Sequence, residues 1–179
     1  DTGGFIQTNQ YCQTSIPSIY AIGDVAGTPC LAHKASHEGI IAVEAIVDES
    51  RAHVLNKKHI PGCTYCFPQV ASVGYKEDEA REMFANIKVG RFPFQANGKA
   101  LAIGEPEGFI KIVFNDDTGE LIGVHMVGAE VTELIQGFSI AQTLEATSDE
   151  LAQTIFPHPT LSEMMHESVL DAYNKAIHI

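Results

Sequence analysis

The sequence is poor in basic residues and has no apolar run long enough to cross a membrane. Its 179 residues include 11 Lys and Arg against 23 Asp and Glu, which gives a net charge of −12. Nucleic-acid-binding surfaces need clustered Lys and Arg, so we expect no nucleic-acid partner, whereas a basic protein partner suits this charge. A membrane-spanning helix needs about 20 mostly apolar residues in succession, so we expect no membrane contact.

An initiator methionine is absent as well, and the first residues do not resemble a signal or transit peptide. We therefore expect the chain to begin inside a longer protein. Among the four cysteines, only Cys63 and Cys66 are close in sequence. Their C-x-x-C spacing is typical of a redox pair or half a zinc site, but no second C-x-x-C exists, so we interpret it as coincidental, with both thiols in or beside a strand. His33 and His37 share a helical face without the H-E-x-x-H pattern, and no metal site is predicted.

Residues 1–50 have the pattern of the terminal piece of an α/β nucleotide-type domain. Residues 5–8 and 19–22 are apolar enough to be short strands, and apolar residues at helical spacing predict a helix over 31–47. Asp24 follows the second predicted strand, at the edge where open α/β sheets bind ligands. Its carboxylate suits a hydrogen bond to a sugar or polyol hydroxyl, or alternatively caps the next segment.

A polar segment over 51–60 leads to Pro61-Gly62 and is the predicted linker between this remnant and a second domain over 61–179. In that domain we predict an α+β fold, in which helices cover an antiparallel sheet. The segment 98–108 is expected to be irregular. The predicted strands are 70–73, 87–94, 109–114 and 121–127, and the predicted helices are 77–84, 131–147, one opened by Ser148, and one over 161–176.

The segment 156–163, Phe-Pro-His-Pro-Thr-Leu-Ser-Glu, carries the strongest candidate for chemistry. A carboxylate bonded to one ring nitrogen of a histidine fixes the tautomer and makes the other nitrogen a better base, which suits His158 and Glu163. The same spacing is that of a capping box, with Thr160 as N-cap and Glu163 at N3. Glu163 then begins a polar helix face that also includes Glu167. Both interpretations of Glu163, as the partner of His158 and as a helix cap, stay open.

Five motifs together resemble the carboxyl-terminal portion of the dihydrolipoamide dehydrogenases, within the flavin-dependent disulfide reductase family. The resemblance covers nearly the whole chain. The motifs are Thr14 with Tyr20-Ala-Ile-Gly-Asp24, Leu31-Ala-His-Lys-Ala35, Pro68-Gln-Val-Ala-Ser-Val-Gly74, Gly123-Val-His-Met-Val-Gly-Ala-Glu130 and His158-Pro-Thr-Leu-Ser-Glu163.

The resemblance implies a role for each of the candidate residues. It implies that Asp24 bonds hydroxyls of FAD and that the backbone of Cys30, Leu31, Ala32 and His33 approaches the flavin ring. It implies that His158 takes a proton from dihydrolipoamide while Glu163 orients it, and that the His158–Pro159 bond is cis. These implied roles are grouped as catalytic for His158 and Glu163, and as cofactor-binding for Asp24, Cys30, Leu31, Ala32 and His33.

The family reaction passes electrons from dihydrolipoamide through a redox disulfide and FAD to NAD⁺. The resemblance implies a homodimer formed by residues from 61 onward, with the helices around 130–145 and 161–176 buried, and the His-Glu pair reaching into the partner's active site. An implied partner is the acyltransferase subunit of a 2-oxo acid dehydrogenase complex. The implied compartment is bacterial cytoplasm, with mitochondrial matrix as the alternative.

The chain also departs from the family pattern. The G-x-G-x-x-G fingerprint, the C-x-x-x-x-C redox pair and the NAD domain are missing, so we expect the chain alone to be inactive and not to hold FAD tightly. Phe156 stands where many relatives have a second histidine. Alternative interpretations are a related disulfide reductase such as glutathione reductase, which Leu161 disfavours, and a stand-alone dimerisation or docking module without catalysis.

Overall fold

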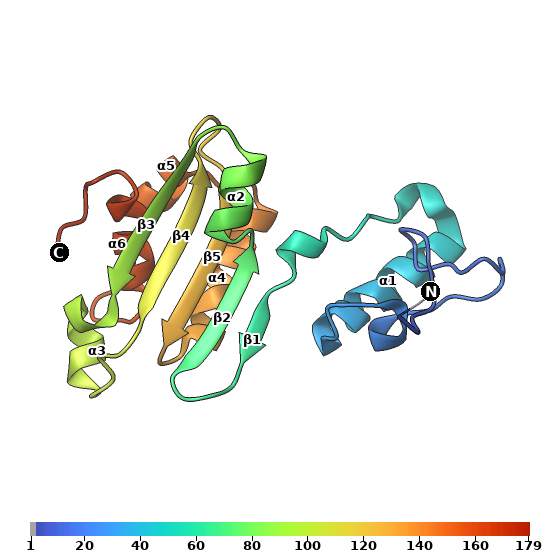
Figure 1. Cartoon of the computed structure of the whole chain (residues 1–179), viewed down its shortest axis with the longest axis horizontal. Coiled ribbons are helices and arrows are strands. Elements are labelled where there is room, and N and C mark those ends of the chain that lie inside the picture. The colour runs from blue at the N-terminus through green and yellow to red at the C-terminus, as the bar shows by residue number, and fades with distance from the viewer. Residues whose placement is uncertain (1–2) are drawn as a thin grey trace. The chain divides into compact units, whose positions relative to one another are not determined.

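The computed structural model describes residues 3–179, which belong to two compact units, Asp1–Lys57 and Lys58–Ile179 (Figure 1). The first unit contains the 3-10 turns η1 (Gly23–Ala26) and η2 (Glu49–Arg51) and the helix α1 (Ala32–Asp48). The predicted helix over 31–47 is therefore confirmed. A third 3-10 turn, η3 (Lys57–His59), spans the division between the units.

Both strands predicted in the first unit are wrong. Residues 5–8 have no regular structure, and in the segment 19–22 only Tyr20 forms a β-bridge, with Gln13. Ile19 and Ile22 remain 47% and 41% exposed. An apolar run becomes a strand only where a neighbouring strand pairs its N–H and C=O groups. Here the Ile19 N–H bonds to Ile16, and pairing is limited to the Ile19 carbonyl and the Ala21 N–H, which bond to residues 14 and 12.

The second unit is built on one five-stranded antiparallel sheet, which confirms the predicted fold class. Four neighbouring strand pairs give the order β1-β2-β5-β4-β3, all antiparallel. Pro93 ends β3 at the sheet edge, where a residue without N–H is tolerated. The strands are β1 (Gly62–Thr64), β2 (Gln69–Gly74), β3 (Ile87–Pro93), β4 (Phe109–Asn115) and β5 (Leu121–Gly128).

Helices cover both faces of this sheet (Figure 1). On one face, α4 (Val131–Thr143) packs on β2 and β5, and α6 (Glu163–Asp171) packs on β3 and β4, over the main apolar core. On the other face, α2 (Glu77–Met83) covers a smaller cluster around Ala80, Val113 and Ile122. The remaining helices are α3 (Gly98–Ala102), preceded by η4 (Phe94–Ala96), and α5 (Ser148–Gln153).

Two predictions in this unit are wrong, each for a local reason. The segment 98–108 contains α3, because the Asn97 carboxamide accepts the Ala100 N–H at 2.8 Å and caps that helix. Helix α4 ends at Thr143 and not near 147, and Glu145 follows with a φ of 54°. The predicted helix opened by Ser148 is confirmed as α5, and Thr147 is its N-cap, in a capping box with Glu150.

The last helix begins and ends differently from the prediction. Helix α6 starts at Glu163 with Ser162 as N-cap, so Thr160 is not its cap, and it ends at Asp171, before Ala176. Glu167, predicted on an exposed polar face, is 5% exposed. Glu167 is buried because residues after the helix fold back, and Ile177 and His178 bond to the Glu167 carboxylate.

Candidate functional site

His158 and Glu163 are joined by a hydrogen bond, and the carboxylate has a second partner. Glu163 Oε1 lies 2.9 Å from His158 Nδ1, and Glu163 Oε2 accepts the Thr160 N–H at 2.8 Å. The Thr160 hydroxyl, however, donates to the Pro157 carbonyl at 2.6 Å and does not cap the helix. One carboxylate thus bonds both the imidazole and the Thr160 N–H, but the predicted capping box does not form, because Ser162 and not Thr160 is the N-cap of α6.

The electrostatics of this pair favour a histidine that works as a base. Burial opposes ionisation of Glu163, but the hydrogen bonds from the Thr160 N–H and from His158 outweigh it, and its pKa is lowered. Because an ionised carboxylate only accepts, Nδ1 of His158 carries the hydrogen, and Nε2 of the neutral ring is left as the acceptor. The His158 side chain is 81% exposed, so this nitrogen is accessible from solvent.

The His158–Pro159 peptide bond is cis, as the resemblance implied. Two other X-Pro bonds in the described chain are cis, Thr28–Pro29 and Phe67–Pro68.

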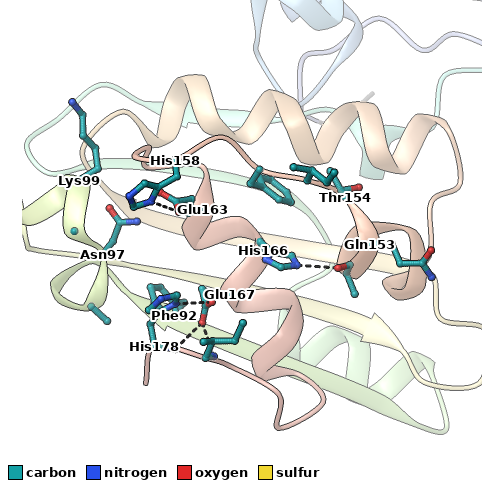
Figure 2. Close-up of a pocket in the computed structure, with 16 residues that line it drawn as sticks. Phe92, Asn97, Lys99, Gln153, Thr154, His158, Glu163, His166, Glu167 and His178 are labelled. Carbon is teal, nitrogen blue, oxygen red and sulfur yellow. Dashed lines mark hydrogen bonds and ion pairs between the residues drawn. The ribbon is translucent and has the colours of Figure 1, made fainter.

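The pair opens into a pocket of about 610 Å³ within the second unit (Figure 2). Helix α6 supplies Glu163, His166 and Glu167 to its wall, and Lys99 comes from α3. A second histidine–glutamate pair lies in the same pocket. Glu167 contacts His178 of the C-terminal segment, a pairing that the sequence analysis missed.

Glu167 holds the C-terminal segment against α6. Its Oε2 accepts the N–H groups of Ile177 and His178 at 3.0 and 3.2 Å, and its Oε1 lies 2.9 Å from His178 Nδ1. Burial opposes ionisation of this carboxylate, yet the bond from His178 and the two N–H groups outweigh it and lower its pKa. The sequence signal was weak, because a Glu eleven residues before a His has no local spacing rule.

Phe156 occupies a stacked position at the pocket wall. Its ring lies 5.4 Å from that of His166 with an interplanar angle of 25°, and His166 Nε2 lies 2.9 Å from the Ala152 carbonyl oxygen. The contact fixes the chain just before His158.

The residues predicted to bind FAD lie in the first unit, around the start of α1. Asp24 is exposed in η1, and the exposed residues Cys30, Ala32 and His33 and the half-buried Leu31 surround the helix start. Leu31 is the N-cap and provides no capping side chain. Uncapped N–H groups at a helix start attract electron-rich groups, and an exposed carboxylate accepts hydroxyls. These residues therefore fit a flavin nucleotide.

Two further properties concern metals and membranes. Among residues 3–179, no group of three or more His, Cys, Asp or Glu side chains is arranged to hold a metal ion. Within the same range, no helix combines the length and apolar character needed to cross a bilayer. Cys63 lies in β1 and Cys66 in the loop after it, and all four cysteines are free thiols.

Comparison with known proteins gives consistent results. A dihydrolipoyl dehydrogenase of Zymomonas mobilis is 60% identical over 175 residues, which are 98% of this chain and 38% of that protein. One of Rhizobium etli is 58% identical over 174 residues, 97% of this chain and 36% of that protein. The crystal structure of LpdA from Mycobacterium tuberculosis superposes with a TM-score of 0.86 at 27% identity, covering 92% of this chain and 36% of that one.

The chain thus spans 36 to 38% of the length of these two curated relatives. Residues 1–39 match the family described as pyridine nucleotide-disulphide oxidoreductase, and residues 60–169 match the dimerisation domain of the same family. The resemblance to dihydrolipoamide dehydrogenases, drawn from the sequence motifs, is confirmed by these relatives. With more than half of its residues in the matched dimerisation domain, the chain belongs to the pyridine nucleotide-disulphide oxidoreductases.

Proposed function

We propose that this chain is the carboxyl-terminal part of a dihydrolipoyl dehydrogenase, which oxidises dihydrolipoamide with NAD⁺ through FAD and a redox disulfide. The observation that carries the proposal is the 2.9 Å contact between His158 Nδ1 and Glu163 in a chain 60% identical to a protein of that name. In this proposal residues 61–179 form the dimerisation domain, residues 51–60 the linker, and residues 1–50 the end of the FAD-binding domain.

In the proposed reaction His158 is the general base. Its Nε2 takes the proton of one thiol of dihydrolipoamide, and the resulting thiolate attacks one sulfur of the redox disulfide, whose S–S bond breaks with its electron pair on the other sulfur. Glu163 keeps Nδ1 protonated and stabilises the imidazolium that forms. All four cysteines of this chain are free thiols. In this proposal the redox disulfide is therefore supplied by a part of the enzyme outside residues 1–179.

The cofactor-binding role is proposed for the start of α1 and the turn before it. Asp24 would accept hydrogen bonds from hydroxyls of the ribityl or neighbouring groups, and the backbone of residues 30–33, at the uncapped start of α1, would hold the flavin. FAD, when bound, carries the electron pair from the reduced disulfide to NAD⁺. We propose that the chain alone holds FAD weakly and is inactive.

The proposed assembly is a homodimer in which the His158–Glu163 pair serves the partner's disulfide. Apolar side chains on and near α4 support it, because Ile140 is 52% and Leu144 is 73% exposed. Further proposed features are the acyltransferase subunit of a 2-oxo acid dehydrogenase complex as partner and the bacterial cytoplasm as compartment, supported by the acidic net charge of −12 and by bacterial relatives.

A chimaera tests the proposal. Residues 1–179 replace the matching segment of the Zymomonas mobilis relative, and NADH formation from dihydrolipoamide is measured. His158→Gln is expected to lower kcat by about a hundredfold to ten-thousandfold, the usual loss of a general base. The matched control is His53→Gln, because His53 also bonds to a glutamate, Glu44 at 3.1 Å, but on an exposed surface outside the pocket. It is expected to change kcat less than about twofold.

Two results would contradict the proposal. A His158→Gln chimaera with parental kcat would remove the base from the mechanism, and NADH formation by the isolated chain would show that residues 1–179 suffice for turnover. The mass of the isolated chain in solution tests the assembly separately, with a dimer expected and a strict monomer counting against it.

A further inference from the structure

A buried ion pair ties helix α1 to the turn that contains Asp24. Lys34 and Glu38 are one helical turn apart, with Lys34 Nζ 2.9 Å from Glu38 Oε1, and their side chains are 1% and 10% exposed. The ammonium group also donates to the carbonyl oxygens of Gly23 at 3.1 Å and Gly27 at 2.9 Å. An ammonium has three donors, so each donor of Lys34 has an acceptor.

Glu38 completes the contact with the same turn. Its second oxygen, Oε2, accepts the Gly23 N–H at 2.7 Å. Gly23 is therefore held at both its N–H and its C=O, in the left-handed region with a φ of 74°. A Cβ at this position would lie 3.2 Å from Ala35 Cβ, so the backbone approaches α1 closely.

The anchored positions lie on either side of Asp24. Gly23 immediately precedes it, and Gly27 closes the turn by donating its N–H to the Asp24 carbonyl at 3.1 Å. The carboxylate itself stays exposed. The two anchors come from the first and second turns of α1, whose uncapped start is at Leu31 and Ala32. The pair thus fixes the distance between Asp24, the proposed acceptor of FAD hydroxyls, and the start of α1, which is proposed to bind the flavin.

Stability alone does not account for this arrangement. Burying two charges costs several kcal/mol, and replacement of a buried ion pair by apolar residues of similar size is often neutral or stabilising. What apolar residues cannot do is bond to the Gly23 N–H and to the two carbonyl groups. Apolar side chains could bury the turn equally well, but the conformation of its backbone depends on the charged pair.

We propose that Lys34 and Glu38 are positioning residues that hold Asp24 in register with the start of α1, so that both bind one FAD. The inference rests on the proposed function, because FAD binding by this unit is part of it. Neither side chain touches FAD. Their effect passes through the backbone of Gly23 and Gly27.

The test uses the chimaera described above, freed of FAD and titrated with it. The double variant Lys34→Met/Glu38→Leu is expected to unfold near the parental temperature but to bind FAD about tenfold or more weakly, the effect of losing hydrogen bonds to charged groups. Asp24→Asn gives the loss of FAD affinity with which that of the double variant is compared. If the pair acts through Asp24, adding the double variant to Asp24→Asn causes little further loss, because coupled sites are not additive.

Two additional variants provide a test that does not depend on the folding of the double variant, and a matched control. Glu38→Asp keeps the charge but shortens the reach to the Gly23 N–H, so it is expected to fold and still lose FAD affinity, which covers the case of a double variant that does not fold. Glu44→Gln, on an exposed part of the same helix, is the matched control and is expected to bind FAD as the parent does.

The outcomes separate this inference from the proposed function. A parental chimaera that does not bind FAD contradicts both. A parental chimaera that binds FAD, with a Glu38→Asp or double variant that binds it equally well, overturns the positioning role alone. Losses that add fully to that of Asp24→Asn also overturn it, since the pair would then act independently of Asp24.

Discussion

The two units of the chain bury different kinds of side chain. In Lys58–Ile179 the core is a continuous apolar cluster with fully buried aromatic residues such as Phe92, Phe114 and Phe138. In the first unit the largest fully buried side chain is that of a lysine, Lys34. Apolar burial is non-directional and tolerates shifts in position, whereas a buried ion pair needs every donor and acceptor in place.

The difference matches the tasks that we propose for the two units. The second unit presents Glu163 at the start of α6, which packs on β3 and β4, and His158 in the segment just before that helix. The first unit has little apolar core to fix Asp24, and hydrogen bonds to the backbone hold its turn instead. Four substitutions, in descending order of expected effect, test this comparison.

Removal of a core aromatic ring should have the largest effect. Phe114 in β4 is fully buried and packs against Tyr173 with ring centroids 6.1 Å apart. Phe114→Ala is expected to lower the free energy of unfolding by about 3–5 kcal/mol, from lost burial and the cavity left behind. Urea denaturation measures it. Ile155→Ala, at a site 95% exposed, should change it by less than about 0.5 kcal/mol, and equal effects would contradict an apolar core as the main stabiliser.

A methyl group at Gly90 tests the close packing of α6 on β3. A Cβ there would lie 1.9 Å from the Ser168 carbonyl oxygen and 2.7 Å from the Ala172 nitrogen. Gly90→Ala is expected to cost about 3 kcal/mol, because α6 must move away from the strand. Gly98→Ala is the matched control, since no atom lies within 4 Å of the added methyl. A Gly90→Ala protein of parental stability in urea would show that α6 is not held tightly.

The Glu167 carboxylate tests whether the second unit also depends on a buried charge. Glu167→Gln is expected to cost about 1–2 kcal/mol at neutral pH and to speed hydrogen exchange at the amides of Ile177 and His178, which bond to it. The pKa of Glu167 is lowered in the folded state. Its stabilisation is therefore complete above the unfolded carboxyl pKa of about 4.3 and is lost as the pH falls through the folded value.

The measurement for Glu167 is urea unfolding of parent and variant from pH 7 down to acid, with exchange followed by mass spectrometry. The two stabilities should converge at low pH. A difference that stays constant across this range would show that the carboxylate charge is not what holds the C-terminal segment.

The smallest effect is expected at an exposed ion pair in the first unit. His53 and Glu44 are 3.1 Å apart, with side chains 61% and 40% exposed. Glu44→Gln should change the free energy of unfolding by less than about 0.5 kcal/mol, because solvent screens such pairs. Thermal unfolding in low and high salt measures it. Glu38→Gln, measured beside it, removes the charge of a buried glutamate of the same helix; equal losses in the two variants would mean that burial does not distinguish the two glutamates of α1.

Periodicity in the sequence was enough to predict most elements of the second unit. The strands β2 to β5 and the helices α2 and α4 follow apolar patterns whose buried faces the sheet confirms. The three-residue strand β1 is too short to show a period. At Ile122, strict alternation fails, because β5 carries an extra residue opposite Val113 and Phe114, and Ile122 joins the α2 cluster.

Sequence reasoning also paired His158 with Glu163, since five residues around a proline leave little freedom. It treated capping and orienting as alternatives, and only the coordinates show that one carboxylate oxygen bonds the imidazole and the other bonds the Thr160 N–H. The first unit was predicted less well. The apolar run at 19–22 satisfied the strand pattern without a neighbouring strand to pair with, and nothing local in the sequence distinguishes those two cases.

By itself, the sequence determined the α+β class, the family and the contact between His158 and Glu163, because these depend on periodic burial and on short separations along the chain. The tertiary structure decided that Glu167 is buried under the C-terminal segment and that Lys34 and Glu38 hold the turn before α1. Such contacts join residues 7 to 15 positions apart. Hydrogen bonds of this kind depend on where the folded backbone brings each donor and acceptor, and no residue pattern specifies that.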